Sequence, residues 1–199
     1  MTTALHKARL ETVVQAVIDT GARTVLDLGC GAGDLILSLA NVPQISRLTG
    51  LDIDLEALRD LRARLQSLPP EAQAKIQIAH ASMTVGHPNL RHYDCACLVE
   101  TIEHLPLADI NRLERAIFHD MRPRHVIVTT PNADYNPVLG VPAHRFRHPG
   151  HHFEWGRARF SAWADGVASR SGYNVSRHDI AGVHPVLGGA SQMAAFQRA

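Results

Sequence analysis

The chain has 199 residues, 45% of them hydrophobic, which is enough for one core of ordinary size and too little for two domains. Its 20 Lys and Arg against 19 Asp and Glu give a net charge of +1, which excludes the broad basic field of proteins that bind long nucleic acids. Three cysteines are too few for a disulfide framework, so we expect a reducing, cytoplasmic setting.

The N-terminal segment, residues 3–20, has the spacing of an amphipathic helix, with charges every few residues. It is neither a secretory signal nor a membrane span, so we expect no membrane partner. A strand, Thr24–Leu28, follows, then a glycine-rich turn with a helix after it, and a second strand that ends at Asp52.

The middle of the chain continues the alternation of strands and helices. We expect helices at residues 55–68 and 107–121 and strands at 75–79, 93–99 and 124–130. Successive βα units with almost wholly apolar strands predict an α/β fold, a doubly wound, Rossmann-like and mostly parallel sheet within one domain spanning residues 1–199.

The last third begins with a long irregular segment, residues 132–156, rich in Pro, Gly, His and Arg. Loops of this length inside a compact domain are usually functional. A helix, Arg157–Ser171, and a strand, Tyr173–Ile180, come next, and we expect residues 192–197 to form a final antiparallel strand at the sheet edge.

The first turn predicts a nucleotide site. Gly29, Gly31 and Gly33 stand where a strand turns into a helix, so the backbone can approach a ligand at the positive helix terminus. Dinucleotide enzymes favour G-x-G-x-x-G, whereas the third glycine here comes one residue early and Asp34 occupies the place of theirs. The alternative is a glycine turn that only reverses the chain direction and binds no ligand.

Two acidic residues make the prediction of a nucleotide site more specific: Asp27 precedes the glycines and Asp52 ends the second strand. The combination resembles class I methyltransferases, which use S-adenosylmethionine. The resemblance implies that Asp27 lies near the methionine amino group, that Asp52 binds the ribose, and that Ser82 and Met83 contact adenine. The cysteines, Cys30, Cys95 and Cys97, are interpreted as small buried residues.

A second cluster follows the strand at 93–99. If the chain turns helical there, Glu100, Glu103 and His104 share one face, and two carboxylates with an imidazole suit Mg²⁺ or Mn²⁺ better than structural zinc. Catalytic zinc uses the same ligand types and stays open at this point. The alternative is a plain helix start, with acids near the positive end of the helix. Small-molecule methyltransferases carry similar stretches, so this cluster alone does not identify the acceptor.

The loop carries a more specific pattern. Thr-Pro-Asn-Ala-Asp-Tyr-Asn begins at Thr130, and Arg-His-Pro-Gly-His-His-Phe-Glu-Trp-Gly-Arg spans residues 147–157. With the acid cluster, these segments resemble the HEN family of small-RNA 3′-terminal ribose 2′-O-methyltransferases over nearly the whole chain. Gly150 replaces an acid of the family pattern, Asp134 replaces a glutamate, and Gly156 replaces a threonine.

The resemblance implies one divalent ion, Mg²⁺ or Mn²⁺, held by Glu100, Glu103, His104 and His151, with the adjacent His152 as an alternative ligand. Loss of the acid at Gly150 removes one partner that would orient a ligand histidine. The candidates for accepting the proton in catalysis are His104, His148 and His151, and the sequence does not choose among them.

The implied reaction is metal-dependent transfer of a methyl group from S-adenosylmethionine to the 2′-hydroxyl of the last nucleotide of RNA with a free 2′,3′-diol. Candidate contacts to the RNA end are Arg9, Asn132, Arg147 and Arg157. Bacterial relatives work beside RNA repair and end-processing proteins, which are the expected partners. Two alternatives stay open: a small-molecule O-methyltransferase and a non-catalytic module that binds S-adenosylmethionine.

Overall fold

The computed structural model describes residues 4–199, so the expected helix start at residue 3 lies outside the described residues. All named strands belong to one seven-stranded sheet with the order β3-β2-β1-β4-β5-β7-β6. The strands are β1 Thr24–Leu28, β2 Arg47–Asp52, β3 Ile76–His80, β4 Cys95–Val99, β5 His125–Pro131, β6 Tyr173–Ile180 and β7 Ser191–Arg198.

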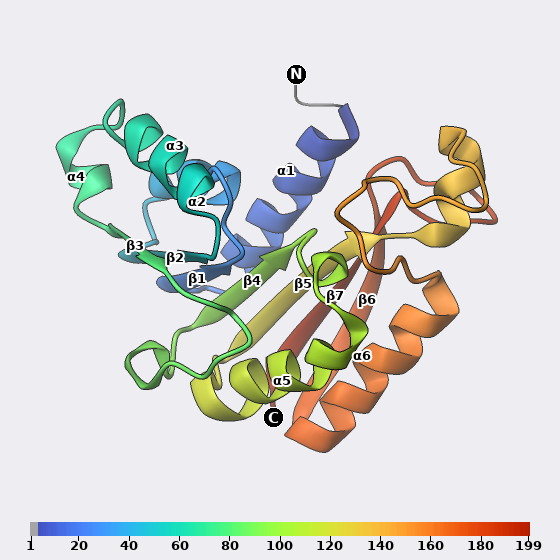
Figure 1. Cartoon of the computed structure of the whole chain (residues 1–199). Helices are drawn as coiled ribbons and strands as arrows, with labels where there is room; N and C mark the ends of the chain where they lie inside the picture. The colour runs from blue at the N-terminus through green and yellow to red at the C-terminus, as the bar shows by residue number, and fades with distance from the viewer. Residues whose placement is uncertain (1–3) are drawn as a thin grey trace.

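The helices cover both faces of the sheet (Figure 1). They are α1 Ala4–Asp19, α2 Asp34–Ala40, α3 Leu55–Leu65, the single turn α4 Pro70–Gln73, α5 Ile110–Glu114 and α6 Arg157–Ser171. One apolar cluster joins α1, α2 and α3 to the sheet, and the other contains α5, α6 and the π-helical residues Arg115–Met121. Parallel strands buried on both faces require this double cover.

The predicted fold class is confirmed: β1 to β5 pair in parallel and β7 is antiparallel to both of its neighbours. The expected position of the last strand was wrong, because β7 lies between β5 and β6 and the edge strand is β6. Burial explains the order, since Ala194 and Phe196 in β7 are almost inaccessible whereas most of β6 is partly or fully exposed.

Most predicted elements match within a few residues. The helix expected at 55–68 ends at Leu65, and the helix expected at 107–121 is a 3₁₀ turn, α5 and a π-helical segment in succession. The long loop contains one 3₁₀ stretch, Ala133–Leu139, and is otherwise irregular.

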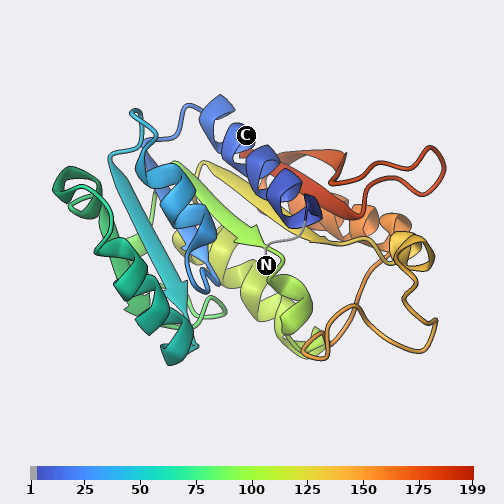
Figure 2. The same ribbon diagram turned by 90° about the horizontal axis from the view of Figure 1, so that it is seen from above.

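The carboxyl ends of the parallel strands meet at one edge of the sheet, where the glycine turn, the acid cluster and the long loop also lie. The view from above shows the loop of residues 132–156 beside the loop that joins β6 to β7 (Figure 2). Hydrogen bonds from the side chain of Asn132 to the carbonyls of Leu187 and Gly189 tie these two loops together. Within residues 4–199, no helix combines the length and apolar content needed to cross a bilayer.

Candidate active site

The glycine turn between β1 and α2 is held in a left-handed backbone conformation. Gly29, Gly31 and Gly33 have φ angles of 80°, 51° and 85°, which residues with a Cβ rarely adopt. A Cβ on Gly29 would collide with the side chain of Thr101, so this glycine also permits the close approach of the segment after β4. The turn therefore brings the two candidate sites into contact.

Asp52 closes the turn from the end of β2. One carboxylate oxygen accepts a hydrogen bond from the backbone N–H of Gly31 at 2.7 Å, and the other accepts from the N–H of Asp54 at 2.8 Å. These bonds fix the carboxylate at the wall of a cavity of about 360 Å³. Ser82 and Met83 line the same cavity, so the predicted ribose and adenine contacts share one space.

Asp27 lies in a second cavity of about 260 Å³, beyond the glycine turn. Its carboxyl is 5% exposed, and burial, followed by the negative charges of Asp52 and Asp34, raises its pKa to about 7. Gly29, Gly31 and Glu100 line both cavities, which together make an elongated crevice at the carboxyl ends of the strands. A cationic group in the second cavity would restore the charge on Asp27.

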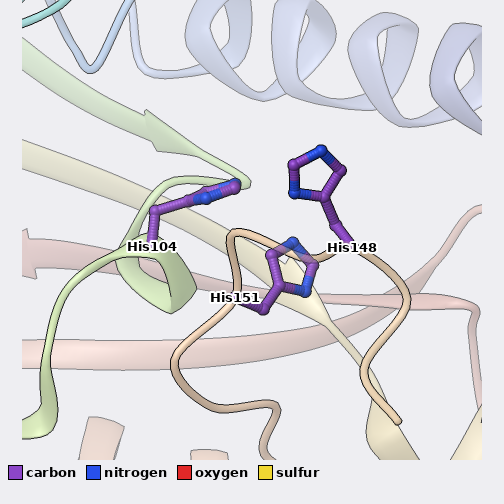
Figure 3. A group of neighbouring side chains, drawn as sticks. All are labelled: His104, His148 and His151. Atoms are coloured by element: carbon purple, nitrogen blue, oxygen red, sulfur yellow. The ribbon is translucent and has the colours of Figure 1, made fainter.

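A third cavity, of about 700 Å³, adjoins the crevice at Glu100 and is lined by four histidines, of which His104, His148 and His151 lie close together and His6 comes from α1. His104 comes from the 3₁₀ turn after β4, and His148 and His151 come from the long loop (Figure 3). Their side-chain nitrogens lie within 4.8 Å of one another, and the ring centroids of His104 and His151 are 4.7 Å apart. Each ring offers one nitrogen, so ligand type and spacing allow these three residues to hold a metal ion. We call this third cavity the histidine pocket.

The hydrogen bonds of the rings distinguish the three histidines. Nδ1 of His104 lies 3.1 Å from the carbonyl of Gly150, and Nδ1 of His151 lies 2.6 Å from a carboxylate oxygen of Glu154. Both Nδ1 atoms must donate, so in the neutral rings Nε2 keeps a free lone pair. His148 is the reverse, because its Nδ1 accepts from the N–H of Gly150 at 3.0 Å and the proton of the neutral ring is therefore on Nε2.

The two glutamates are held by the end of β5. The hydroxyl of Thr129 donates to Glu100 at 3.0 Å, and that of Thr130 donates to Glu103 at 2.9 Å. Glu100 itself has a φ of 52°, an unfavourable conformation for a residue with a side chain. The expected helical face is thus not formed, since only Ile102–His104 make a 3₁₀ turn. Glu100, Glu103 and His104 still line one pocket, but the group of close ligand atoms found within residues 4–199 is His104, His148 and His151, without the two glutamates.

Burial raises the pKa of Glu103 well above its ordinary value, and the nearby charge of Glu100 raises it further. Burial also raises the pKa of Glu100, against the opposing charge of Arg9 and the hydroxyl of Thr129. Glu103 is 0% exposed, and its Oε1 has no hydrogen-bond partner. A buried carboxylate oxygen without a partner is costly, and a cation in the pocket would satisfy it.

Glu154 supports the loop side of the pocket. Its carboxylate accepts from His151, from the side chain of Asn136 at 2.7 Å and from the N–H of Arg147 at 2.7 Å. Burial raises the pKa of Glu154, but these hydrogen bonds outweigh it and hold the pKa below the ordinary value. Glu154 therefore supplies a carboxylate partner to His151 although Gly150 lacks one.

The departures from the family pattern have local consequences. A Cβ on Gly150 would stand 3.1 Å from Nδ1 of His148 and 3.3 Å from Nδ1 of His104, so glycine allows the tight histidine packing. A Cβ on Gly156 would collide with the carboxylate of Asp134. The changes at 134 and 156 are thus neighbours in space, and Asp134 accepts from the N–H of Arg157 at 2.9 Å.

The candidate RNA contacts fall in different places. Arg9 reaches from α1 to Glu100 at 3.1 Å and to the hydroxyl of Ser191 at 3.2 Å, and it lines the histidine pocket. Arg147 also lines this pocket, and its guanidinium donates to the carbonyl of Ala190 at 2.6 Å. Asn132 is 0% exposed with its amide used between loops, so we assign it to loop positioning rather than RNA contact.

Two other predicted residues lie apart from the histidine pocket. Arg157 pairs with Asp179 at 3.1 Å and lines a separate cavity against β6. His152 is exposed, and its backbone N–H donates to the carbonyl of Glu103 at 2.8 Å, whereas the ring of His151 stands with the other histidines.

Four residues that hold this site had no role predicted from the sequence: Thr129, Thr130, Glu154 and Ser191. The paired threonines at a strand end were a usable signal, because neighbouring strand residues point to opposite faces and can hold two ligands at once. Glu154 lies within the loop motif at residues 147–157, so its position was a usable signal too. Ser191 had no signal, since its contact with Glu100 at 3.3 Å depends on the placement of β7.

A sheet of this order, with a glycine turn and two strand-end acids around a crevice, defines a class I methyltransferase. The model of the family "Methyltransferase domain" matches residues 25–124. A glycopeptide N-methyltransferase, 14% identical with a TM-score of 0.72, shares the fold.

Proteins with higher sequence identity to this chain identify its family within the class I methyltransferases. The crystal structure of the methyltransferase domain of bacterial CtHen1-C is 33% identical, with a TM-score of 0.88 over 98% of each chain. The small RNA 2′-O-methyltransferase of Gallus gallus is 35% identical over 87% of this chain and 48% of that protein. The chain belongs to the HEN family of S-adenosylmethionine-dependent methyltransferases. It spans about half the length of the curated relatives first matched.

Proposed function

We propose that this chain transfers a methyl group from S-adenosylmethionine to the 2′-hydroxyl of the 3′-terminal nucleotide of RNA, with Mg²⁺ or Mn²⁺ in the histidine pocket. The observation that carries the proposal is the place of Glu100, which lines both cofactor cavities and the histidine pocket. An acceptor held at the histidines therefore lies next to the cofactor. The names of the relatives supply the acceptor, because they are small RNA 2′-O-methyltransferases.

The cofactor crevice fits an elongated nucleoside with a cationic tail. Asp52 offers carboxylate lone pairs to the ribose hydroxyls, while Ser82 and Met83 border the cavity for the base. Gly29, Gly31 and Gly33 let the backbone approach the cofactor closely. At the far end, Asp27 would regain its negative charge beside the amino group of the methionine part.

The donors of the histidine pocket fit a divalent ion. Glu103 presents a buried oxygen without a partner, and His104 and His151 each keep a lone pair on Nε2. Glu100 completes the predicted ligand set, and carboxylates with imidazoles and no thiolate suit Mg²⁺ or Mn²⁺. A bound divalent ion lowers the pKa of a hydroxyl that it coordinates.

The protein residues then position the acceptor and exclude water. His148 contributes an Nε2–H donor toward the pocket, which suits an oxygen of the RNA end better than a metal ion. Burial, followed by the neighbouring His151, lowers the pKa of His104, so this ring stays neutral near pH 7. Of the three proposed catalytic histidines, His104 and His151 thus serve as ligands and His148 as a donor to the substrate.

We also propose a cytoplasmic setting beside proteins that repair or process RNA ends. Cys30, Cys95 and Cys97 are free and buried, which fits a reducing compartment. The resemblance to the HEN family supports RNA repair and end-processing proteins as the partners.

The test compares initial methylation rates on matched oligonucleotides that differ only in the last sugar. A 2′,3′-diol should be the good acceptor, a 2′-deoxy end should be inert, and a 3′-deoxy end or a 3′-phosphate should react slowly. EDTA should abolish the reaction and Mn²⁺ should restore it. Equal rates on diol and 3′-deoxy ends, or full activity in EDTA, would overturn the metal-dependent reaction at the RNA end. Turnover of a catechol panel without RNA would instead support a small-molecule acceptor.

A further inference from the structure

The loop segment 139–152 concentrates positive charge beside the histidine pocket. It contains two arginines and four histidines and no acid, although the whole chain carries a net charge of only +1. Leu139, Arg147, His148 and His151 from this segment line the pocket. A local cationic segment at the mouth of a site favours an anionic ligand that extends out of it.

Exposed apolar side chains are concentrated on the long loop and on the loop that joins β6 to β7. Nine large hydrophobic side chains are exposed among the described residues, and five of them lie on the two loops that Asn132 ties together. These five are Val138, Leu139, Phe146, Val183 and Val186. Phe146 is the single aromatic residue among the nine, with 48% of its surface exposed. Apolar groups gathered beside a site indicate a contact surface.

The two arginines of the segment differ in whether their guanidinium groups are already hydrogen-bonded within the protein. The guanidinium of Arg147 is bonded to Asn136 at 2.5 Å and to the carbonyl of Ala190. Arg145 is exposed, and within residues 4–199 its side chain has neither a hydrogen bond nor an ion-pair partner. Arg145 is therefore the free cation of the segment.

The distance to the pocket limits which part of a ligand these residues meet. Phe146 comes two residues before His148, so their Cα atoms are at most about 7 Å apart. Successive nucleotides of a duplex strand rise by about 3.4 Å, and an unstacked single strand spans more per nucleotide, so a residue this close to His148 lies within reach of the neighbouring nucleotide. A ligand whose last sugar stands at the histidines would pass its preceding nucleotide over Phe146 and Arg145.

We propose that Phe146 and Arg145 bind the penultimate nucleotide of a single-stranded RNA end, with the base stacked on the phenyl ring and a phosphate beside the guanidinium. This inference rests on the proposed function and adds the recognition of a second nucleotide. A base can stack on Phe146 only if it is unpaired, so the last two nucleotides must be single-stranded. Stacking of one base on an aromatic side chain is worth about tenfold in affinity.

The first experiment measures binding rather than turnover, by fluorescence anisotropy of a 5′-labelled single-stranded RNA oligonucleotide with S-adenosylhomocysteine and Mn²⁺ present. We expect Phe146→Ala and Phe146→Leu to weaken binding about tenfold and Phe146→Trp to retain it, because a ring is needed. Arg145→Ala should weaken binding and lower the salt dependence by about one phosphate contact. The control is Arg62→Ala, which removes an exposed arginine from α3 and should leave affinity unchanged.

The second experiment varies the RNA end. A single strand and a duplex with a two-nucleotide 3′ overhang should bind at least tenfold more tightly than a blunt duplex, and Phe146→Ala should remove this difference. A blunt duplex bound as tightly as the single strand, or a Phe146→Ala protein that binds like the parent, would overturn the proposal. If the parent methylates RNA ends but the variants behave like it, only this inference fails. If the parent binds ends through Phe146 without methylating them, only the proposed reaction fails.

Discussion

Nδ1 of His151 lies 2.6 Å from a carboxylate oxygen of Glu154, and the His151 and Glu154 side chains are only 7% and 1% exposed. This pair orients the ring so that Nε2 faces the pocket with its lone pair free. We expect Glu154→Gln to weaken Mn²⁺ binding about 10-fold to 100-fold, because the partner of a metal-bound histidine sets its orientation and basicity. Calorimetric titration with Mn²⁺ measures the effect, and His152→Ala is the matched control. Parent-like affinity in Glu154→Gln would remove His151 from the ligand set.

His148 and His104 should respond differently to removal. Because Nδ1 of His148 accepts the N–H of Gly150, its Nε2 carries the proton and is no metal ligand. We expect His148→Ala to keep Mn²⁺ affinity within about threefold and to raise KM for RNA, whereas His104→Ala should lose metal binding. If His148→Ala and His104→Ala lose Mn²⁺ equally, a three-histidine site replaces the mixed one.

Glu103→Gln should separate stability from metal binding. Burial and the charge of Glu100 raise the pKa of Glu103, which favours the neutral acid in the metal-free protein, so an amide should cost little. We expect a metal-free Tm at or above that of the parent, but no rise in Tm on adding Mn²⁺. The parent should gain about 3 kcal/mol at a Mn²⁺ concentration 100 times Kd. Thermal unfolding with and without Mn²⁺ decides the matter, with exposed Glu71→Gln as control; a parent-like rise would exclude Glu103 as a ligand.

Asp52→Ala should weaken S-adenosylmethionine binding at least tenfold while the sheet stays intact, since charged hydrogen bonds to ribose hydroxyls are lost. The substitution also frees the N–H groups of Gly31 and Asp54, so part of the loss comes from a looser turn. Calorimetric titration with the cofactor measures it. Exposed Asp60→Asn on α3 serves for comparison, and the same affinity in both variants would disprove the ribose assignment.

Asp27 should make stability depend on pH. Its pKa rises from 3.8 to about 7 on folding, so the folded protein binds this proton more tightly than the unfolded chain does. The stabilising contribution is complete below pH 3.8 and is lost as the pH rises through about 7. We expect Asp27→Asn to be more stable than the cofactor-free parent at pH 8, by up to about 4 kcal/mol, with a smaller advantage at pH 5. Urea unfolding between pH 5 and 8 tests this, and an advantage that does not change with pH would contradict it.

The elements of the sheet were predictable because each apolar run and each glycine turn is a local signal. The helix Arg157–Ser171 and the strand Tyr173–Ile180 have the predicted bounds. The position of β7 in the sheet could not be predicted from local signals. An antiparallel strand can pair either at the sheet edge or between two other strands, and the residues of β7 alone do not distinguish these two positions. The position of β7 becomes clear only in the folded sheet, where Phe196 is buried.

The site shows the same division between local and tertiary information. The residues of the cofactor turn were recognisable from spacing, because their roles depend on neighbours in sequence. A shared helical face was expected for Glu100, Glu103 and His104, but a left-handed residue and a 3₁₀ turn place these residues around one pocket instead. Arg9 and Ser191 meet at Glu100 from opposite ends of the described chain, which no pattern in one segment can indicate.

The contact between Ser191 and Glu100 has a consequence for synthesis. The residues that line the first cofactor cavity lie between Gly29 and Leu105 in the sequence, so most of its wall is synthesised early. The histidine pocket needs later residues, because Arg147 is anchored on the carbonyl of Ala190 and Glu100 on the hydroxyl of Ser191. The part of the site proposed to hold the acceptor therefore depends on segments that come much later in the sequence than the part proposed to hold the methyl donor.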